Sequence, residues 1–173
     1  AMFKGIFGEL TSVTFNNFDT SNVTNMEGMF AGCIKLITLN LSGFNTSKVA
    51  DMSNMFEGCE SLSSLDLSNF DMTKVTVTGD MLYDCNSLKT IQTPKNVKVA
   101  IDLPGSNFYK TSNLSTSYSQ IPVGNASITL KRGYTLTANA NNGTIAATSD
   151  WTGSGTTATK VVLFDNNAIS NFP

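Results

Sequence analysis

Residues 18–43 read FDTSNVTNMEGMFAGCIKLITLNLSG, and residues 44–69 read FNTSKVADMSNMFEGCESLSSLDLSN. The two stretches have the same length and agree at 13 of 26 positions, with no insertion or deletion between them. Residues 70–95 continue with a third copy, FDMTKVTVTGDMLYDCNSLKTIQTPK, and residues 2–17 hold a partial copy before the first. Self-similarity at a fixed period of roughly 20–50 residues is the signature of stacked repeats, so we expect the copies to share one core.

Within each copy the spacing of apolar residues changes halfway. The apolar residues of 23–30 and 49–56 recur at helical spacing, which predicts a helix in each copy. Hydroxyl-bearing residues precede each helix as N-cap candidates, and Gly32 and Gly58 stand where a left-handed C-terminal cap would end it. Leu36, Leu39 and Leu41 then predict a short strand. The pattern predicts an α/β repeat fold of about four 26-residue helix–strand coils with a parallel sheet.

The repeat also resembles a known family. The string F-x-T-S-x-V-x-x-M-x-x-M-F-x-G-C-x-x-L-x-x-L-x-L-S, over roughly residues 2–95, resembles the BspA-type leucine-rich repeats of bacterial surface proteins. The resemblance implies a leucine-rich-repeat-like solenoid, an extracellular position on the cell surface or cell wall, and an adhesin that binds host proteins or other microbes. Residues 133–173 resemble the first half of the Listeria–Bacteroides repeat, a small β module of surface proteins.

We expect three segments. Residues 1–95 hold the repeats, and residues 96–132 form a C-terminal all-β cap in which 97–103 alternate apolar and polar residues and could continue the sheet. Residues 133–173 form a partial β-hairpin module, in which Asn142-Gly143 is a hairpin-turn signal. The chain is interpreted as a fragment of a longer protein, because it starts with Ala1-Met2 and stops within a strand-rich stretch.

The composition argues against several functions. The net charge is −2, so no basic surface for nucleic acid is expected, and no apolar run is long enough to cross a membrane. The chain has no histidine, which removes the usual general base and the commonest metal ligand. We therefore expect a protein that is not an enzyme and that uses no cofactor or metal.

Several periodic side chains are assigned to the core. Cys33, Cys59 and Cys85 stand one repeat apart and are interpreted as buried free thiols rather than a disulfide, a metal site or a nucleophile. The methionine pairs at helical spacing are interpreted as core, and Phe18, Phe44 and Phe70 are expected to stack. The scattered carboxylates are interpreted as solvated; they are Glu27, Asp51, Glu57, Glu60 and Asp80.

The outward side chains of the strands are the candidate binding site. If Leu39 and Leu41 point inward, Thr38 and Asn40 point outward. Stacking the copies gives two columns of small polar residues, which we call the strand face. The first column is Ser12, Thr38, Ser64 and Thr90, and the second is Thr14, Asn40, Asp66 and Gln92. A plain solvated sheet face is the alternative interpretation, since no aromatic or arginine residue is expected there.

The function expected from the sequence is adhesion, or protein–protein interaction, through the repeat surface. The partner would be a host or microbial surface protein or glycan, and the protein is expected to be a monomer. A structural spacer or stalk is the first alternative. A carbohydrate-binding module is the second, and it would need a cluster of exposed aromatic residues.

Overall fold

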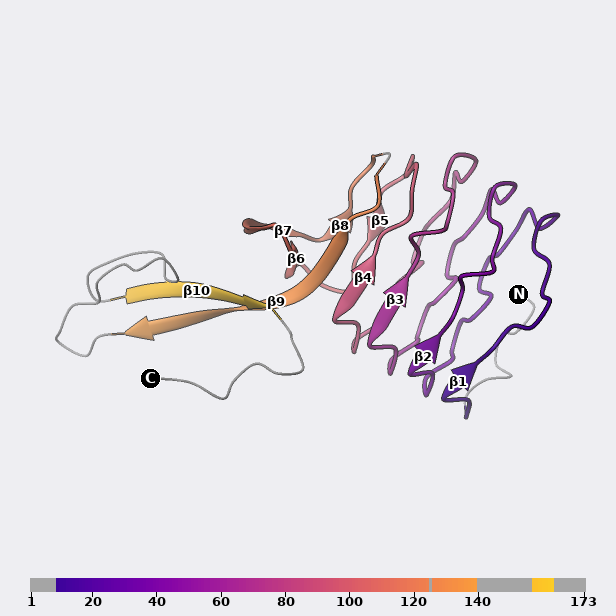
Figure 1. The fold of residues 1–173 in the computed structure, drawn as a ribbon. Helices are drawn as coiled ribbons and strands as arrows, with labels where there is room; N and C mark the ends of the chain where they lie inside the picture. The colour runs from indigo at the N-terminus through magenta and orange to yellow at the C-terminus, as the bar shows by residue number, and fades with distance from the viewer. Residues whose placement is uncertain (1–8, 125, 140–156, 164–173) are drawn as a thin grey trace.

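The computed structural model describes residues 9–124, 126–139 and 157–163 (Figure 1). Across these residues the protein is all-β, with no helix. The strands are β1 (Ser12–Val13), β2 (Thr38–Leu39), β3 (Ser64–Asp66), β4 (Thr90–Gln92), β5 (Ile101–Asp102), β6 (Phe108–Lys110), β7 (Asn113–Tyr118), β8 (Gln120–Ile121), β9 (Thr129–Asn139) and β10 (Thr157–Leu163). Within the described ranges, accordingly, no helix is available to span a membrane.

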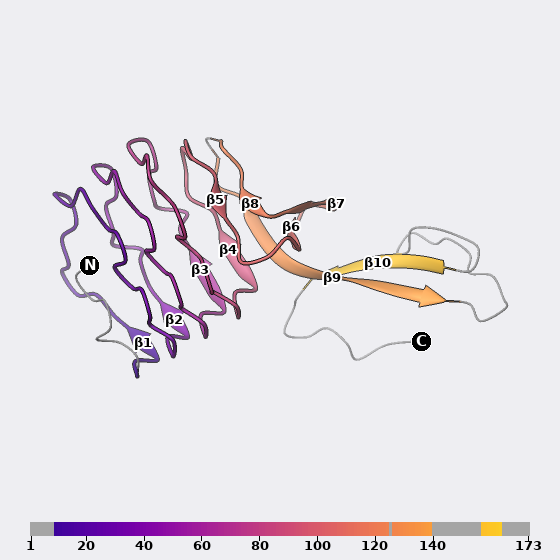
Figure 2. The same ribbon diagram turned by 180° about the vertical axis from the view of Figure 1, so that it is seen from behind.

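The 26-residue copies form coils that stand side by side, from β1 at one end to β4 at the other (Figures 1 and 2). β1 pairs in parallel with β2, and Ser12 lies opposite Thr38. β3 pairs in parallel with β4, and Ser64 lies opposite Thr90. In both pairs the partners are one full repeat apart. β2 and β3 belong to different sheets, but the parallel bridges of Asn25 with Asp51 and of Asp51 with Val77 keep the same 26-residue register along the stack.

The predicted helix–strand solenoid, and with it the leucine-rich-repeat-like α/β fold class, is wrong. The segments assigned to helices form consecutive turns, in which Met29 N donates to Met26 O at 3.2 Å and Ala31 N to Gly28 O at 3.1 Å. These bonds span three residues rather than the four of an α-helix. Gly28 and Gly32 have φ of 57° and 76°, a left-handed conformation that an α-helix cannot contain.

The left-handed positions repeat in every coil. Asn54 and Asp80, the counterparts of Gly28, both have φ of 54°. Gly58 and Asp84, the counterparts of Gly32, have φ of 68° and 56°. Glycine, asparagine and aspartate are the residues that adopt this conformation most readily, so their recurrence at two fixed positions was the sequence signal for turns.

Every second peptide group of these turns points along the stack. Met26 N donates to Asp51 O at 2.9 Å, and Met52 N, on the same planar peptide group as Asp51 O, donates to Val77 O at 2.9 Å. Three further rows repeat this arrangement: Gly28 N to Ser53 O and Asn54 N to Gly79 O, Phe30 N to Met55 O and Phe56 N to Met81 O, and Gly32 N to Glu57 O and Gly58 N to Tyr83 O. We call these four rows the peptide columns. Their N–H groups all point toward the β4 end of the stack.

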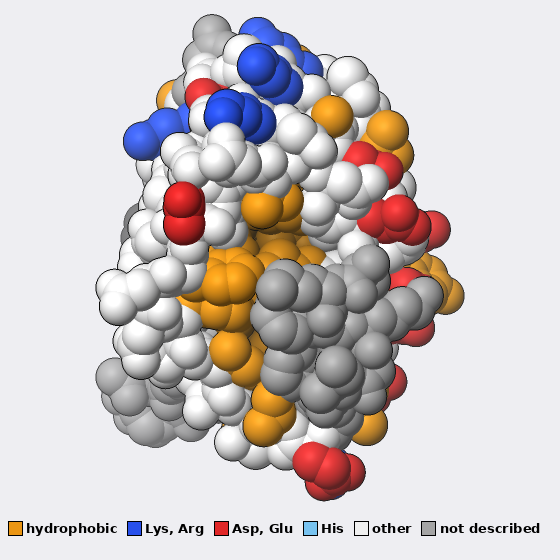
Figure 3. Space-filling model, turned by 90° about the vertical axis from the view of Figure 1, so that its right-hand side faces the viewer, with side chains coloured by type: hydrophobic (Ala, Val, Ile, Leu, Met, Phe, Trp, Pro, Cys, Tyr) orange, Lys and Arg blue, Asp and Glu red, His pale blue; other side chains and the backbone are white. Residues whose placement is uncertain are grey.

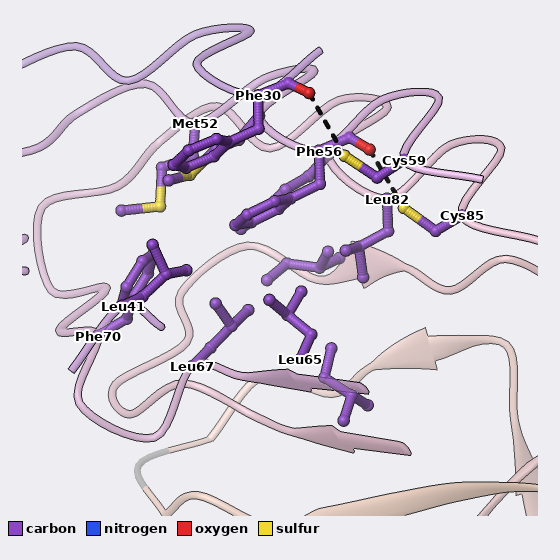
Figure 4. Close-up of a cluster of buried hydrophobic side chains, with 14 of the residues drawn as sticks. Phe30, Leu41, Met52, Phe56, Cys59, Leu65, Leu67, Phe70, Leu82 and Cys85 are labelled. Carbon is purple, nitrogen blue, oxygen red and sulfur yellow. Dashed lines mark hydrogen bonds between the residues drawn. The ribbon is translucent and has the colours of Figure 1, made fainter. Parts of the chain in front are cut away.

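Phenylalanine rings line the inside of the stack. The predicted ladder is confirmed for Phe44 and Phe70, whose rings stack with centroids 6.4 Å apart and planes 10° apart; the ring of Phe18 lies 5.6 Å from that of Phe44 but is tilted by 38°. Phe30 and Phe56 form a second stacked pair at 5.6 Å and 7°. Figure 4 shows the rings of Phe30, Phe56 and Phe70 among buried leucine and methionine side chains of the core. Aromatic stacking at a fixed period helps to hold the coils in register.

The β4 end of the stack is covered by the later part of the chain. β9 pairs antiparallel with β4, with Leu130 opposite Ile91, and β6 pairs with the other edge of β9. The sheet order is therefore β3-β4-β9-β6-β7. The alternation at 97–103 does not continue this sheet, because only β5 forms there and it pairs with β8 in a separate two-stranded sheet.

β9 also pairs along its second half with β10. It runs without a break across residue 132, where the sequence places a segment boundary. The Asn142-Gly143 turn and the single tryptophan, Trp151, lie outside the described residues.

Candidate functional site

The strand face occupies the outer surface of β1 to β4. Ser12, Thr38, Ser64 and Asp66 lie on these strands and are exposed, while Leu65 between the last two is buried. Thr14 and Asn40 directly follow β1 and β2 and are also exposed. The 26-residue register places the members of each column beside one another. The result is a surface of small hydroxyl, amide and carboxylate groups.

The two residues in the last copy of the repeat, residues 70–95, differ from the rest. Thr90 and Gln92 are only half-exposed, because β9 pairs with their strand and places Lys131 opposite Thr90 and Thr129 opposite Gln92. The hydroxyl of Thr129 lies 2.7 Å from Gln92 Oε1 and donates to it. Thr129 and Lys131 therefore extend the polar surface. The repeat pattern could not reveal them, because β9 is not a copy of the repeat.

Two members of the strand face stabilise the backbone. Asn40 Oδ1 accepts a hydrogen bond from Ser42 N at 3.0 Å, and Asp66 Oδ1 accepts one from Ser68 N at 2.9 Å. Both are side-chain turns that close the end of a strand. Thr38 and Ser64 make no such side-chain bond within the described part of the chain. Their hydroxyl groups are accordingly the ones most available to a partner.

A hollow of about 360 Å³ lies where the second polar column meets the β1 end of the stack. Thr14 and Asn40 line it on the polar side, and the half-buried rings of Phe15 and Phe18 line it on the apolar side. Figure 3 views this end and shows hydrophobic side chains gathered near its centre. Sequence reasoning expected no aromatic residue at the strand face, since phenylalanines at these positions were assigned to the interior.

The three cysteines form a buried column of free thiols, as predicted. The thiol of Cys59 donates to Phe30 O at 3.3 Å, and that of Cys85 donates to Phe56 O at 3.2 Å (Figure 4). The contact with the Cys33 thiol, together with burial, raises the pKa of Cys59 well above its ordinary range. Burial raises the pKa of Cys85 to about 12. The thiols of Cys59 and Cys85 therefore stay protonated at neutral pH, which makes them poor nucleophiles.

The methionine pairs lie in the core: Met26, Met29, Met52 and Met55 are all at most 5% exposed. Glu27, Glu60 and Asp80 are exposed, whereas Asp51 and Glu57 are half-buried. Within the described ranges, no group of three or more acidic or cysteine side chains is arranged to hold a metal ion.

The tyrosines bear on the carbohydrate alternative. Tyr83 is 57% exposed, but Tyr109 is buried and Tyr118 is half-buried. Among these three described tyrosines there is thus no cluster of exposed rings on which a sugar could stack. The single exposed ring belongs to a different surface from the strand face, on the turns of the third coil.

The fold and this surface define a class: an all-β protein of stacked 26-residue coils with parallel pairing and a polar strand face. The chain belongs to the family described as "Mycoplasma protein of unknown function, DUF285", whose model matches residues 1–121. The expected membership of the BspA-type leucine-rich repeats is therefore wrong, and the absence of helices from the coils agrees with this correction. No curated protein and no solved structure matches the chain.

Proposed function

We propose that this protein is a non-enzymatic interaction module that adheres to a partner protein or glycan through the strand face. The observation that carries the proposal is the pair of polar columns, which place small hydroxyl, amide and carboxylate groups one repeat apart, in parallel register between β1 and β2 and between β3 and β4. Such a surface offers many weak hydrogen bonds, and their number rather than their individual strength would give affinity.

We expect the partner to make its strongest contacts in the hollow at the β1 end. It places the amide of Asn40 beside the rings of Phe15 and Phe18. Interfaces draw most of their binding energy from a few anchors, commonly aromatic, surrounded by polar groups that exclude water. A partner side chain seated in this hollow would combine both kinds of contact. A position on the cell surface remains a prediction from the sequence.

The test is biolayer interferometry of the protein against immobilised matrix proteins and glycans. The variant Thr38→Arg with Ser64→Arg places two bulky cations on the strand face and leaves the turns of Asn40 and Asp66 intact. The matched control is Thr24→Arg with Ala50→Arg, because these residues are also exposed, also one repeat apart and carry the same change of charge.

Saturable binding that is lost in the strand-face variant and kept in the control would support the proposal. Binding that both variants retain would show that another surface is responsible. If the folded protein binds no member of the panel, the spacer alternative is favoured instead.

A further inference from the structure

The peptide columns end in a row of backbone donors at the third coil. In the second coil, Asn54 N, Phe56 N and Gly58 N donate to carbonyl oxygens of the third coil at 2.8–3.0 Å. Their counterparts one repeat later are the N–H groups of Asp80, Leu82 and Asp84. The third coil has the same turn bonds and the same left-handed residues, so these N–H groups point the same way, out of the stack. Within the described residues, none of the three donates a hydrogen bond.

The residues of this row line a groove of about 340 Å³ between the turns of the third coil and residues 102–105; Asp80 and Asp84 are exposed there, whereas Leu82 is buried. Asp80, Leu82, Tyr83, Asp84 and Asn86 form one wall, and Asp102, Leu103, Pro104 and Gly105 form the other. Arg132 joins the two walls, since its guanidinium donates to Asn86 O at 2.8 Å and to Pro104 O at 2.6 Å. These two hydrogen bonds connect the walls of the groove.

The charges around the groove identify the kind of ligand. Three carboxylates line it, those of Asp80, Asp84 and Asp102, against one cation beside it, the guanidinium of Arg132, which already donates to carbonyls of both walls. An anion would meet the donor row but would be repelled by these carboxylates. A neutral acceptor such as a peptide carbonyl meets the N–H groups without that penalty. Cationic side chains on the same ligand would pair with the carboxylates.

We infer that this groove binds a basic peptide segment of a partner protein. The main-chain carbonyls of the peptide accept hydrogen bonds from the N–H groups of the exposed Asp80 and Asp84, as the carbonyls of the third coil do for the second. Lysine or arginine side chains of the peptide pair with Asp80 and Asp84. The ring of Tyr83, which is 57% exposed, adds a face over which a cation can lie. The site lies apart from the strand face and does not depend on the function proposed for it.

The probe is the octapeptide Ala-Lys-Ala-Lys-Ala-Lys-Ala-Lys, titrated into the isotopically labelled protein and followed by amide NMR. We expect chemical-shift changes and slower hydrogen exchange at the amides of Asp80 and Asp84. The same peptide with glutamate in place of lysine should bind at least tenfold more weakly. Spermine carries cations but no carbonyls, so it should not slow exchange at these amides.

The binding variant is Asp80→Asn with Asp84→Asn, which removes two charges but keeps residues that tolerate the left-handed conformation; Asn54 already does so at the position equivalent to Asp80. The matched control is Asp51→Asn with Asp66→Asn, because Asn25 and Asn40 already occupy the equivalent positions one repeat earlier. Weakening of at least tenfold in the first variant alone would support the inference. Equal weakening in both variants, shifts spread over other surfaces, slower amide exchange with spermine, or no shift at millimolar peptide would overturn it.

Discussion

The hydroxyl of Thr46 makes two hydrogen bonds to the backbone of Asp71, in the next coil. It donates to Asp71 O at 3.1 Å and accepts from Asp71 N at 2.8 Å. Thr20 makes the same pair of bonds to Asn45, at 3.0 and 2.7 Å. Both threonines are at most 2% exposed. Residues that the sequence offered as helix caps therefore connect one coil to the next.

Replacing this connection should cost stability. Thr46→Val keeps the shape of the side chain but leaves the N–H and carbonyl of Asp71 without their partner, so we expect the free energy of unfolding to fall by about 1–3 kcal/mol. Urea denaturation measures the loss. Thr76→Val is the control, because the exposed Thr76 hydroxyl makes a single bond of 3.3 Å, to Ala50 O. Equal losses of stability in the two variants would show that the pair of hydrogen bonds to Asp71 stabilises the fold no more than the single bond of Thr76 does.

The left-handed turns predict how substitutions at Gly58 change the stability of the fold. Its φ is 68°, and an added Cβ would lie 3.7 Å from the backbone of Gly32, which is ordinary contact. The cost of Gly58→Ala is therefore conformational, roughly 1–2 kcal/mol. Gly58→Asn should cost less, since asparagine tolerates this φ. Gly43→Ala, where φ is not left-handed and no atom lies within 4 Å, should change stability by less than about 0.5 kcal/mol.

These three variants are compared by thermal and urea unfolding. The order Gly43→Ala, Gly58→Asn, Gly58→Ala, from least to most destabilised, is the expected result. A Gly58→Ala variant as stable as the unmodified protein would contradict the role assigned to the turns.

The buried thiol of Cys85 predicts a loss of stability in alkali. Its pKa is raised to about 12 by burial, whereas an unfolded thiol ionises near its ordinary pKa of about 8.5. The folded state therefore holds its proton while the unfolded state releases one, and unfolding becomes easier as pH rises from about 8.5 toward 12. Between pH 7 and pH 10 the unmodified protein should lose about 1–2 kcal/mol more than Cys85→Ala. Parallel losses in urea titrations at the two pH values would refute this.

The carboxylate of Asp71 predicts the opposite dependence in acid. Hydrogen bonds from the Thr73 hydroxyl and the Asn96 amide, and then from Thr73 N, hold the pKa of Asp71 below its ordinary value. Its contribution to stability is present above the ordinary aspartate pKa of about 3.9 and disappears as pH falls through the lowered folded pKa. Asp71→Asn should therefore lose less stability on acidification below about pH 4 than the unmodified protein does.

The variant should keep its fold, because Asn45 holds the same turn one repeat earlier by accepting from Ser47 N at 3.1 Å. Urea titrations at pH 6 and pH 3 test the prediction. Identical losses for the two proteins between these pH values would show that other groups control the acid response.

The sequence predicted the register of the repeats and the residues of the core better than it predicted the backbone conformation. Exact 26-residue repetition places Phe44 over Phe70 whatever the local conformation is, so the stacked rings and the buried thiols could be anticipated. Apolar spacing of three and four residues could not separate a helix from a run of turns, because both bring such residues to one side. The residues that distinguish turns from a helix are Gly28 and its counterparts Asn54 and Asp80, because these residue types adopt the left-handed conformation seen at all three positions.

The strand face could be placed from the repeat, but its surroundings could not. Thr38 and Ser64 are exposed where the register puts them. The half-covered state of Thr90 depends on Lys131, which is far along the chain and follows no repeat. The hollow beside Asn40 depends on the rings of Phe15 and Phe18 being only half-covered at the β1 end, which no spacing argument reveals.

The peptide columns also give the stack an electrical direction. Each peptide group carries a dipole of about 3.5 D, and dipoles aligned head to tail add together. In the columns the peptide group of Met52 lies between those of Met26 and Thr78, all oriented alike. The stack therefore carries a partial positive charge at its end near Asp80 and Asp84 and a partial negative charge at the first coil. The dipole axis runs along the stack, perpendicular to the local direction of the chain. A protein without a single described helix acquires the polarity usually associated with one.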